Sequence, residues 1–221
     1  MLNRSVVAVC LALGLIVPSV AMAGNNGLGV KASTLGAGIE YERQFNEILG
    51  MRLGVNYFQI DSDFDVDDIN YDASVDLQSA SAVADWYPFA GAFRLTGGIM
   101  YNGNETDISA TPSRPVTIGD LVFTPQMVGT LQGNVTFNKV SPYAGIGWTN
   151  GREKSEGLSI AFDIGVLFQG SPDIENYRAT GPLAGNPVFE AELEKEVLKI
   201  EDELDSYRYY PVVALTLTYR F

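Results

Sequence analysis

The feature that most constrains the fold is an alternation of apolar and polar residues that recurs along the chain. From Leu158 to Phe168 every second residue is large and apolar, and the residues between them include Ser159, Asp163 and Gly165. A period of two is typical of a β-strand with one apolar and one polar face. Similar alternation is found in 49–57, 93–101, 140–148 and 213–221. Because no apolar run long enough for a spanning helix follows the N-terminal segment, these patterns predict an all-β protein.

Composition excludes several classes of function. The 221 residues include no His and a single Cys, Cys10, and they carry a formal net charge of −13. Without His, the usual general base of Ser and Cys hydrolases and the commonest metal ligand are missing. One Cys forms neither an intramolecular disulfide nor a thiolate metal cluster. The acidic balance argues against binding to nucleic acids.

The N-terminal segment, residues 1–23, has the organisation of a secretory signal peptide. Arg4 lies in a short polar start, an apolar stretch follows, and Ala21 and Ala23 form the small-x-small pattern that signal peptidase cleaves. The apolar stretch is too short for the alternative, a membrane anchor. We therefore expect a mature domain of residues 24–221 that leaves the cytoplasm and contains no cysteine.

The alternating stretches have the length and the flanking residues of transmembrane strands. Their length matches the roughly 9 to 11 residues that a tilted strand needs to cross a bilayer. Glycines on the polar face, such as Gly98 and Gly165, suit a narrow interior. These features favour a membrane barrel over the alternative with the same alternation, a soluble β-sandwich. Aromatic residues stand at the ends of the stretches, where a barrel has its interfacial girdles: Tyr57, Trp86, Tyr87, Tyr101, Trp148, Tyr219 and Phe221.

The last stretch adds a family resemblance. Val213–Phe221 ends on Phe221, carries Tyr219 two residues earlier, and has apolar residues at every second position before that. This pattern resembles the closing-strand assembly signal of Gram-negative outer-membrane β-barrel proteins. Asp85–Phe89 and Gly29–Gly36 also resemble segments of small proteins of this class. The resemblance implies a place in the outer membrane of the cell envelope, contacts with lipid and lipopolysaccharide, and partners among the periplasmic chaperones and the barrel-assembly machinery.

The strand count follows from the connections between predicted strands, because short and long connections alternate along the chain. Because such barrels have short turns in the periplasm and long loops outside, the strand that ends at Phe45 runs parallel to the last one, and another strand must precede it. A break in apolar phase within 27–45 predicts two short strands joined near Ser33–Thr34, which gives eight antiparallel strands. The alternative, one long strand with a bulge, would change this count. The short connections are 44–48, 88–92 and 150–157, and the long ones are 61–70, 106–134 and 171–206.

An eight-stranded barrel has an interior about wide enough for side chains alone. Because an unpaired buried charge costs several kcal/mol, we expect charged residues there to pair and to close the lumen. The alternative is a small, porin-like solute channel. The polar strand faces place four cationic and four anionic residues inside: Lys31, Arg52, Arg94 and Arg220 with Glu40, Glu42, Asp85 and Asp163.

The segment 61–72 is predicted to be an acidic loop and is the candidate metal site. However, Val66 occupies the sixth position of the loop, where an EF-hand needs Gly. We therefore expect no dedicated cofactor, and at most divalent cations that the loop binds loosely and shares with the phosphates of lipopolysaccharide. Carboxylates suited to a hard cation such as Ca²⁺ stand at alternate positions: Asp61, Asp63, Asp65 and Asp67.

One amphipathic helix is predicted in the long connection before the last strand. Asn186 is a suitable N-cap, Pro187 stands at the first helical position, and apolar residues recur at helical spacing from Phe189 to Leu204. We expect this stripe to pack on the barrel rim or on other loops; the alternatives are a partner helix or a plug over the lumen. A short hairpin is expected in 116–123.

Catalysis is the sharpest alternative to weigh. Glu40 and Glu42 share one face of a strand, as a paired-carboxylate mechanism requires. Lumen carboxylates that merely form salt bridges have the same pattern, and no His is present to assist them. We therefore expect no catalytic residues and a non-enzymatic role, structural or in surface interaction, with an extracellular ligand as the candidate partner.

Overall fold

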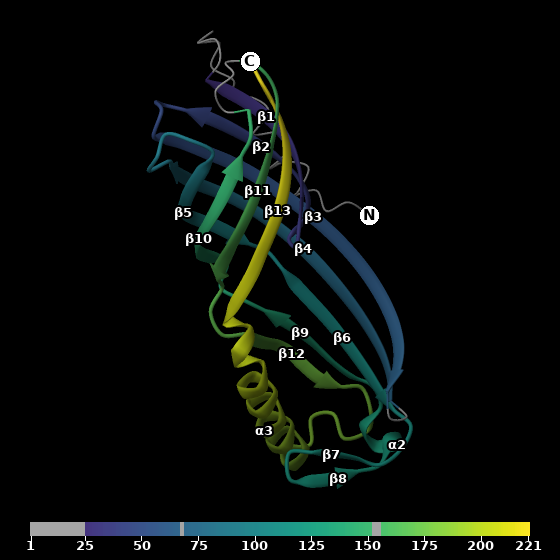
Figure 1. The fold of residues 1–221 in the computed structure, drawn as a ribbon. Helices are drawn as coiled ribbons and strands as arrows, with labels where there is room; N and C mark the ends of the chain where they lie inside the picture. The colour runs from purple at the N-terminus through teal and green to yellow at the C-terminus, as the bar shows by residue number, and fades with distance from the viewer. Residues whose placement is uncertain (1–24, 67–68, 152–155) are drawn as a thin grey trace.

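The computed structural model describes residues 25–66, 69–151 and 156–221 (Figure 1). Eight strands close into an antiparallel barrel, as predicted, because β4 pairs with β5 at one side of the sheet and β1 with β13 at the other. The predicted signal peptide lies outside the described residues, and no helix within them is long and apolar enough to cross a membrane. The barrel strands are β1 (Asn26–Ser33), β2 (Gly36–Gln44), β3 (Leu49–Val66), β4 (Ile69–Trp86), β5 (Phe93–Asn102), β10 (Val140–Thr149), β11 (Gly157–Phe168) and β13 (Tyr209–Arg220).

The phase break near the N-terminus is a hairpin between β1 and β2. Ser33 pairs with Gly36 at its tip, and the Ser33 hydroxyl donates a hydrogen bond of 2.9 Å to the Gly36 carbonyl. Gly36 has a φ of +102°, a backbone conformation that side chains with a Cβ rarely adopt. The two-strand reading of this segment is therefore confirmed, and with it the even strand count.

The two ends of the barrel differ in the length of their connections. Short turns join β2 to β3, β4 to β5 and β10 to β11 at one end, where Gly27 of β1 also pairs with Arg220 of β13 (Figure 1). At the opposite end, β5 is joined to β10 and β11 to β13 through further strands and helices, and β3 and β4 themselves continue past the barrel. The predicted long connections 106–134 and 171–206 are thus confirmed, whereas most of the predicted long connection 61–70 belongs to β3 and β4.

The opposite end continues as an open sheet, which we call the extension. It consists of the distal halves of β3 and β4, to which β6 (Glu105–Pro112), β9 (Leu131–Thr136) and β12 (Asp173–Ala179) are added in that order. These three strands directly precede or follow β5, β10 and β11 in the chain and continue their direction. The wall of the molecule is consequently tall along β3 and β4 and low along β1, β2 and β13 (Figure 1).

The acidic segment 61–72 was predicted to be a loop, but its described residues, 61–66 and 69–72, belong to strands β3 and β4. β3 and β4 pair without interruption from Leu49 opposite Trp86 to Val66 opposite Ile69. The loop was predicted because the segment is rich in Asp, which is common in loops. Its apolar and acidic residues nevertheless alternate with a period of two, as in a strand. Described side chains on this outer face, such as Asp61 and Asp63, are exposed to water, so the strand accommodates their charge.

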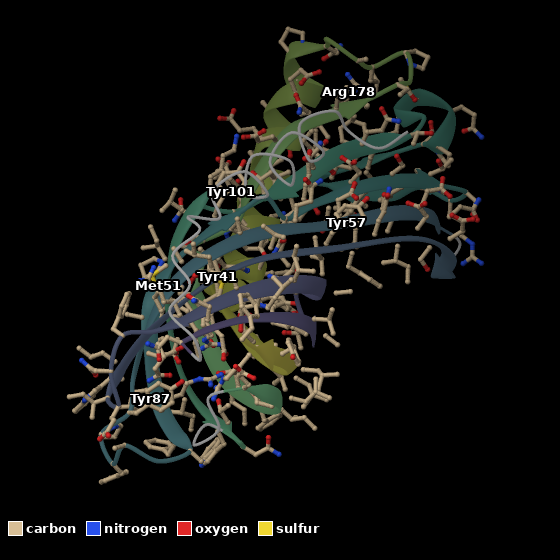
Figure 2. All side chains as sticks on the ribbon, turned by 90° about the horizontal axis from the view of Figure 1, so that it is seen from above. Tyr41, Met51, Tyr57, Tyr87, Tyr101 and Arg178 are labelled. Carbon is tan, nitrogen blue, oxygen red and sulfur yellow. The ribbon has the colours of Figure 1, made fainter. Side chains whose placement is uncertain are left out.

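The two faces of the sheet exchange polarity where the barrel gives way to the extension. Along β3, the outward positions are apolar up to Tyr57 and acidic at Asp61 and Asp63, whereas the inward positions change from Arg52 and Asn56 to apolar residues. Figure 2 shows Tyr57 and Tyr101 midway along the molecule, at this change. The position of the change marks where the outer surface leaves an apolar environment and enters water.

A small unit, which we call the cap, covers part of the extension. It contains β7 (Val116–Ile118), β8 (Leu121–Phe123), α2 (Pro125–Val128), α3 (Pro187–Leu204) and the 3₁₀ turn Asp205–Arg208. The hairpin expected in 116–123 is therefore confirmed as β7 and β8. A separate apolar core holds the cap on the extension: Ile118, Val128, Leu131, Ala179, Phe189 and Leu193.

The predicted helix before the last strand is confirmed as α3. The Asn186 carboxamide oxygen accepts hydrogen bonds from the backbone N–H groups of Val188 and Phe189, at 3.0 and 3.4 Å. Phe189 and Leu193 are buried, and the Phe189 ring meets Phe123 edge to face at 5.0 Å between centroids. The helix thus packs on the other connections, as expected. Its neighbour β12 was not anticipated from the sequence.

Candidate functional site

The lumen of the barrel is filled by a charged network that centres on Arg52 of β3. Its guanidinium lies 2.6 Å from Asp85 on β4 (Nε to Oδ2), 3.2 Å from Glu40 on β2 (Nη1 to Oε1) and 3.3 Å from Asp163 on β11 (Nη1 to Oδ2). These partners come from both neighbouring strands and from across the interior. Arg52 therefore ties opposite walls of the barrel together.

Arg94 of β5 supplies a second cation to the same carboxylates. Its Nη2 lies 2.8 Å from Asp163 Oδ2, and its Nε lies 3.6 Å from Asp85 Oδ1. The hydroxyl of Thr96 also donates to Asp85, at 2.6 Å, and Arg94 donates to the hydroxyl of Thr149. Each carboxylate thus has more than one donor, which is what buried charges require to offset their lost hydration.

Two further ion pairs complete the set of eight charged residues predicted to lie inside. Lys31 Nζ lies 3.2 Å from Glu40 Oε2, which joins it to the network. Arg220 Nε lies 2.6 Å from Glu42 Oε1 and forms a separate pair closer to the short-turn end. We call the connected group the lumen network, and its three cations balance its three anions: Lys31, Arg52 and Arg94 with Glu40, Asp85 and Asp163.

Glycine makes room for this network. A Cβ atom on Gly147 would lie 2.4 Å from Asp163 Oδ1 and 2.9 Å from Arg94 Nε, closer than real Cβ contacts come. The predicted role of small residues on the polar face is thus visible in atomic detail. Any larger residue at this position would displace a salt bridge.

An apolar layer also crosses the lumen, next to the charged network and towards the extension. Sequence reasoning missed it, and the expectation of a lumen closed by polar side chains alone is therefore incomplete. Its members come from six separate segments, and each is an isolated apolar residue on an otherwise polar strand face or turn, so no local pattern signals it. The layer consists of Leu35, Val83, Met100, Tyr143, Leu167 and Val212.

The two layers border one small cavity. The cavity between them, lined among others by Arg52, Met100 and Tyr143, has a volume of about 20 Å³. A volume of this size holds about one water molecule. Among the residues described, the charged network and the apolar layer therefore both occupy the lumen.

The candidate catalytic residues, Glu40 and Glu42, and the candidate metal ligand Asp61 each have a partner within the protein. Glu40 is bound by Lys31 and Arg52, and Glu42 by Arg220, so both carboxylates are engaged by cations. Asp61 accepts a hydrogen bond of 2.7 Å from Ser74 on the neighbouring strand.

The four aspartates do not form a site in the part of the chain that the structure describes. Asp61 and Asp63 follow one another along the outer face of β3, Asp65 continues that strand, and Asp67 lies outside the described residues. No group of three or more ligating side chains comes together among the residues described. Of the predicted assembly signal, the side chains of Tyr219 and Phe221 are both about half exposed on the outer wall.

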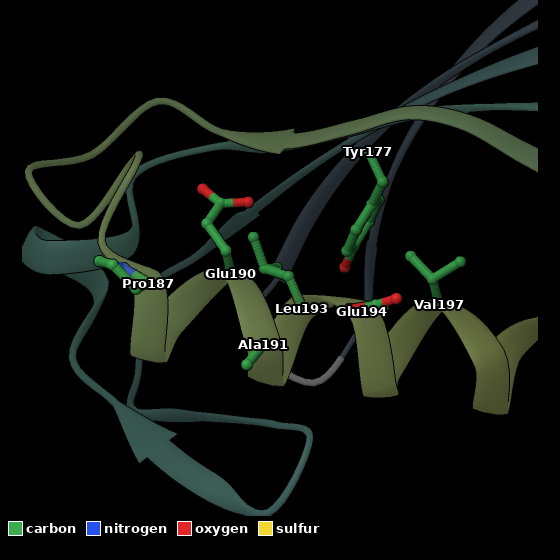
Figure 3. A pocket seen from close by; sticks show the side chains of 7 residues that line it. All are labelled: Tyr177, Pro187, Glu190, Ala191, Leu193, Glu194 and Val197. Carbon is green, nitrogen blue, oxygen red and sulfur yellow. The ribbon is translucent and has the colours of Figure 1, made fainter.

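The cap has a groove on its surface. A groove of about 410 Å³ runs between α3 and β12, with Leu193 and Val197 below Tyr177 and the carboxylates of Glu190 and Glu194 at its margins (Figure 3). Its size is within the range of ligand pockets. Glu190 already accepts a hydrogen bond from the backbone of Gly185, at 2.9 Å.

The lysines of α3 hold the cap together. Lys195 Nζ lies 2.8 Å from both Asp120 and Glu192, and these bonds lower the pKa of the two carboxyl groups and raise the pKa of Lys195. Lys199 donates to the Gly119 carbonyl at 2.6 Å. The tip of the β7–β8 hairpin is thereby fastened to the helix.

The solved structures that resemble this chain are outer-membrane barrels. CarO of Acinetobacter baumannii matches 88% of this chain and 97% of its own, with a TM-score of 0.58 and 20% identity. CarO2 of the same organism matches 90% of this chain and 99% of its own, with a TM-score of 0.59 and 20% identity. No family model and no curated protein matches the chain. At this identity the likeness shows the fold, that of a small outer-membrane β-barrel.

Proposed function

Starting from an eight-stranded barrel that lies in the outer membrane, we propose that this protein does not conduct solutes and serves as an anchor for an extracellular binding surface. In this proposal the short turns face the periplasm, and the extension and the cap stand outside the cell. Catalysis has no part in it, because the two same-face carboxylates Glu40 and Glu42 are each engaged by a cation.

The observation that carries the proposal is the filled lumen. A channel needs a continuous polar path, whereas here an apolar layer lies next to six charged side chains that satisfy one another. Opening a path through them would leave charges such as Arg94 and Asp163 unpaired in a narrow interior. Removing one partner of a buried pair costs about 3–5 kcal/mol, so an open state would be rare.

The surface role is supported by the position of the extension and the cap, which lie outside the barrel. The extension and the cap have their own apolar core around Phe189 and Leu193, and they project from one side of the barrel (Figure 1). An ordered unit at this location is suited to contacts with molecules outside the cell.

Liposome swelling in a small sugar tests the proposal. We expect liposomes that contain the wild-type protein to swell no faster than protein-free liposomes. A variant that thins both lumen layers, Arg94→Ala with Tyr143→Ala, should swell faster than a control with two lipid-facing truncations, Leu95→Ala with Tyr101→Ala. A heat-dependent gel shift verifies that each barrel is folded. Rapid swelling with the folded wild-type protein would instead support the alternative role, a small solute channel.

A further inference from the structure

The distal half of β3 is a free edge of the extension. β2 pairs with β3 only as far as Ala37 opposite Tyr57, and from Phe58 to Val66 the strand pairs with β4 alone. No strand among those described lies on its other side, and Figure 1 shows it as the outer margin of the sheet. Every second residue of an edge strand points its N–H and C=O groups away from the sheet, where another chain can pair with them.

Apolar side chains are exposed beside this edge on the inner face of the sheet. Phe58 and Ile60 retain 44% and 49% of their surface accessible, although both stand in a regular strand. Ile108 of β6 lies on the same face and is 37% exposed. The inner face near β3 is therefore apolar and is not fully covered by the cap.

The outer face along the same edge is acidic. Asp61 and Asp63 stand there on β3, and β4 and β6 add further carboxylates. The pKa of Asp107 on β6 is raised by burial and by the neighbouring negative charges of Glu105 and Asp76. Arg178, which is on this face, belongs to β12 at the opposite edge of the sheet.

We propose that the free edge of β3 from Phe58 to Asp63 receives an extended segment of a partner protein in which Lys or Arg residues alternate with apolar residues. The inference deepens the surface-binding role proposed above and rests on it. One added strand satisfies three features together: its backbone pairs with the edge, its apolar residues cover Phe58 and Ile60, and its cations face Asp61 and Asp63. This is the β-strand addition mode of peptide recognition, with specificity from alternate side chains.

A second copy of this chain is a poor occupant of the same edge. Two β3 edges paired antiparallel would bring Asp61 and Asp63 of both copies onto one face, and like charges directly opposite each other destabilise a pair of strands. The acidic residues therefore protect the edge against self-association while they favour a cationic partner.

Binding of designed peptides to the refolded full-length barrel in detergent micelles tests the proposal. The probe is a labelled nine-residue peptide in which Lys and Val alternate, and fluorescence anisotropy measures its affinity. One control peptide has Glu in place of Lys, and the other has the same Lys and Val residues arranged in two blocks. We expect the alternating cationic peptide to bind more tightly than either control, and less tightly at high salt concentration.

Hydrogen exchange locates the bound peptide. We expect it to slow exchange of amides within Phe58–Val66 and to leave those of Asp173–Ala179 on the opposite edge unchanged. The double variant Asp61→Asn with Asp63→Asn should bind about 3- to 10-fold more weakly, because two exposed charge pairs are lost. Glu175→Gln, on the outer face of β12, is the matched control and should bind as the wild type does.

The outcomes separate this inference from the proposed function. Equal binding of the alternating and block peptides, protection at β12, or a larger loss with Glu175→Gln would each overturn strand addition at β3. Self-association of the wild type through protected β3 amides would also overturn it, in favour of a second copy. Rapid liposome swelling would refute the proposed anchor, whereas peptide binding at β3 would still be measurable in the same preparation.

Discussion

The barrel and the extension share two strands, β3 and β4, yet opposite faces of those strands are apolar in the two regions. In the barrel the outward residues are apolar and the inward charges are paired, as Arg52 is with Glu40, Asp85 and Asp163. In the extension the outward residues are acidic, and the inward ones, such as Phe58 and Ile60, are apolar. The environment of the outer face therefore decides which side of a strand carries charge. The charges of the lumen network balance one another, whereas the outer face of the extension is acidic along β3.

The largest expected difference between the two regions comes from removing an arginine. Arg94→Ala leaves Asp163 and Asp85 without one of their buried cations and should lower the free energy of unfolding by about 3–5 kcal/mol. Arg178→Ala, in the extension, removes an exposed hydrogen bond to Gln132 and should cost less than about 1 kcal/mol. Urea unfolding of both variants in micelles checks this. Equal losses would contradict the claim that the barrel depends on paired charge more strongly than the extension does.

The second prediction concerns the separate core of the cap. Phe189→Ala removes a fully buried ring and should destabilise the cap by about 3–5 kcal/mol. Its neighbour Val188 is 62% exposed, so Val188→Ala is the matched control and should have little effect. Limited proteolysis should cleave the Phe189→Ala variant within α3 while its barrel keeps the heat-dependent gel shift. Loss of that shift would mean that the cap and the barrel fold as one unit.

A third prediction contrasts the inside of the barrel with its lipid-facing wall. A Cβ atom on Gly165 would lie 2.4 Å from the hydroxyl oxygen of Tyr143, whereas one on Gly97 would first meet an atom at 4.0 Å. Gly165→Ala should therefore cost about 1–3 kcal/mol through overpacking of the apolar layer. Gly97→Ala should leave stability nearly unchanged. The same urea titrations measure both, and a neutral Gly165→Ala would contradict a tightly packed lumen.

The smallest expected effect is a pH dependence that differs in sign between the extension and the cap. The folded-state pKa of Asp107 is raised by burial, Glu105 and Asp76, so its contribution to stability falls as pH rises through its titration. Hydrogen bonds from Lys195 lower the pKa of Asp120, so that contribution is present above the unfolded pKa and lost as pH falls through the folded one. Carboxyl-carbon NMR titrations should place Asp107 above, and Asp120 below, the usual aspartate range. A lowered pKa for Asp107 together with a raised pKa for Asp120 would contradict the charge environments described for these two residues.

The barrel could be predicted because the membrane imposes a simple rule on its strands. Alternation in stretches such as Leu158–Phe168, together with short and long connections, was enough to derive eight strands and the hairpin at Ser33–Thr34. The cap helix could be predicted because Asn186 and Pro187 mark its start. In both cases a local pattern has a single physical cause.

The extension was not predicted because its strands depart from the simple barrel pattern: β3 reverses its polarity and becomes acidic, and β12 is irregular. Asp61 and Asp63 alternate with apolar residues, but the sense of the alternation is reversed, and their acidity suggested a loop. β12 contains a register irregularity, with Asn176 at a φ of +56°, which breaks its period. A switch of polarity along one strand is visible only once its partner strand is known.

The charged residues of the lumen could be named from the sequence, but their partners could not. Strand order makes Arg52 and Asp85 near neighbours on β3 and β4, whereas the contact of Arg52 with Asp163 crosses the interior. The apolar layer was missed for the same reason, since residues as far apart in the chain as Leu35 and Leu167 join one cluster only when the sheet closes. Contacts across a lumen depend on closure and leave no trace within a single strand.

The central claim, a barrel filled by two layers and therefore closed, is tested most directly by current through the purified protein in a planar lipid bilayer. The account predicts no steady conductance from the wild type, with the heat-dependent gel shift showing that the barrel is folded. A steady, reproducible conductance from folded wild-type protein, altered by substitution of Arg52 or Arg94, would contradict it.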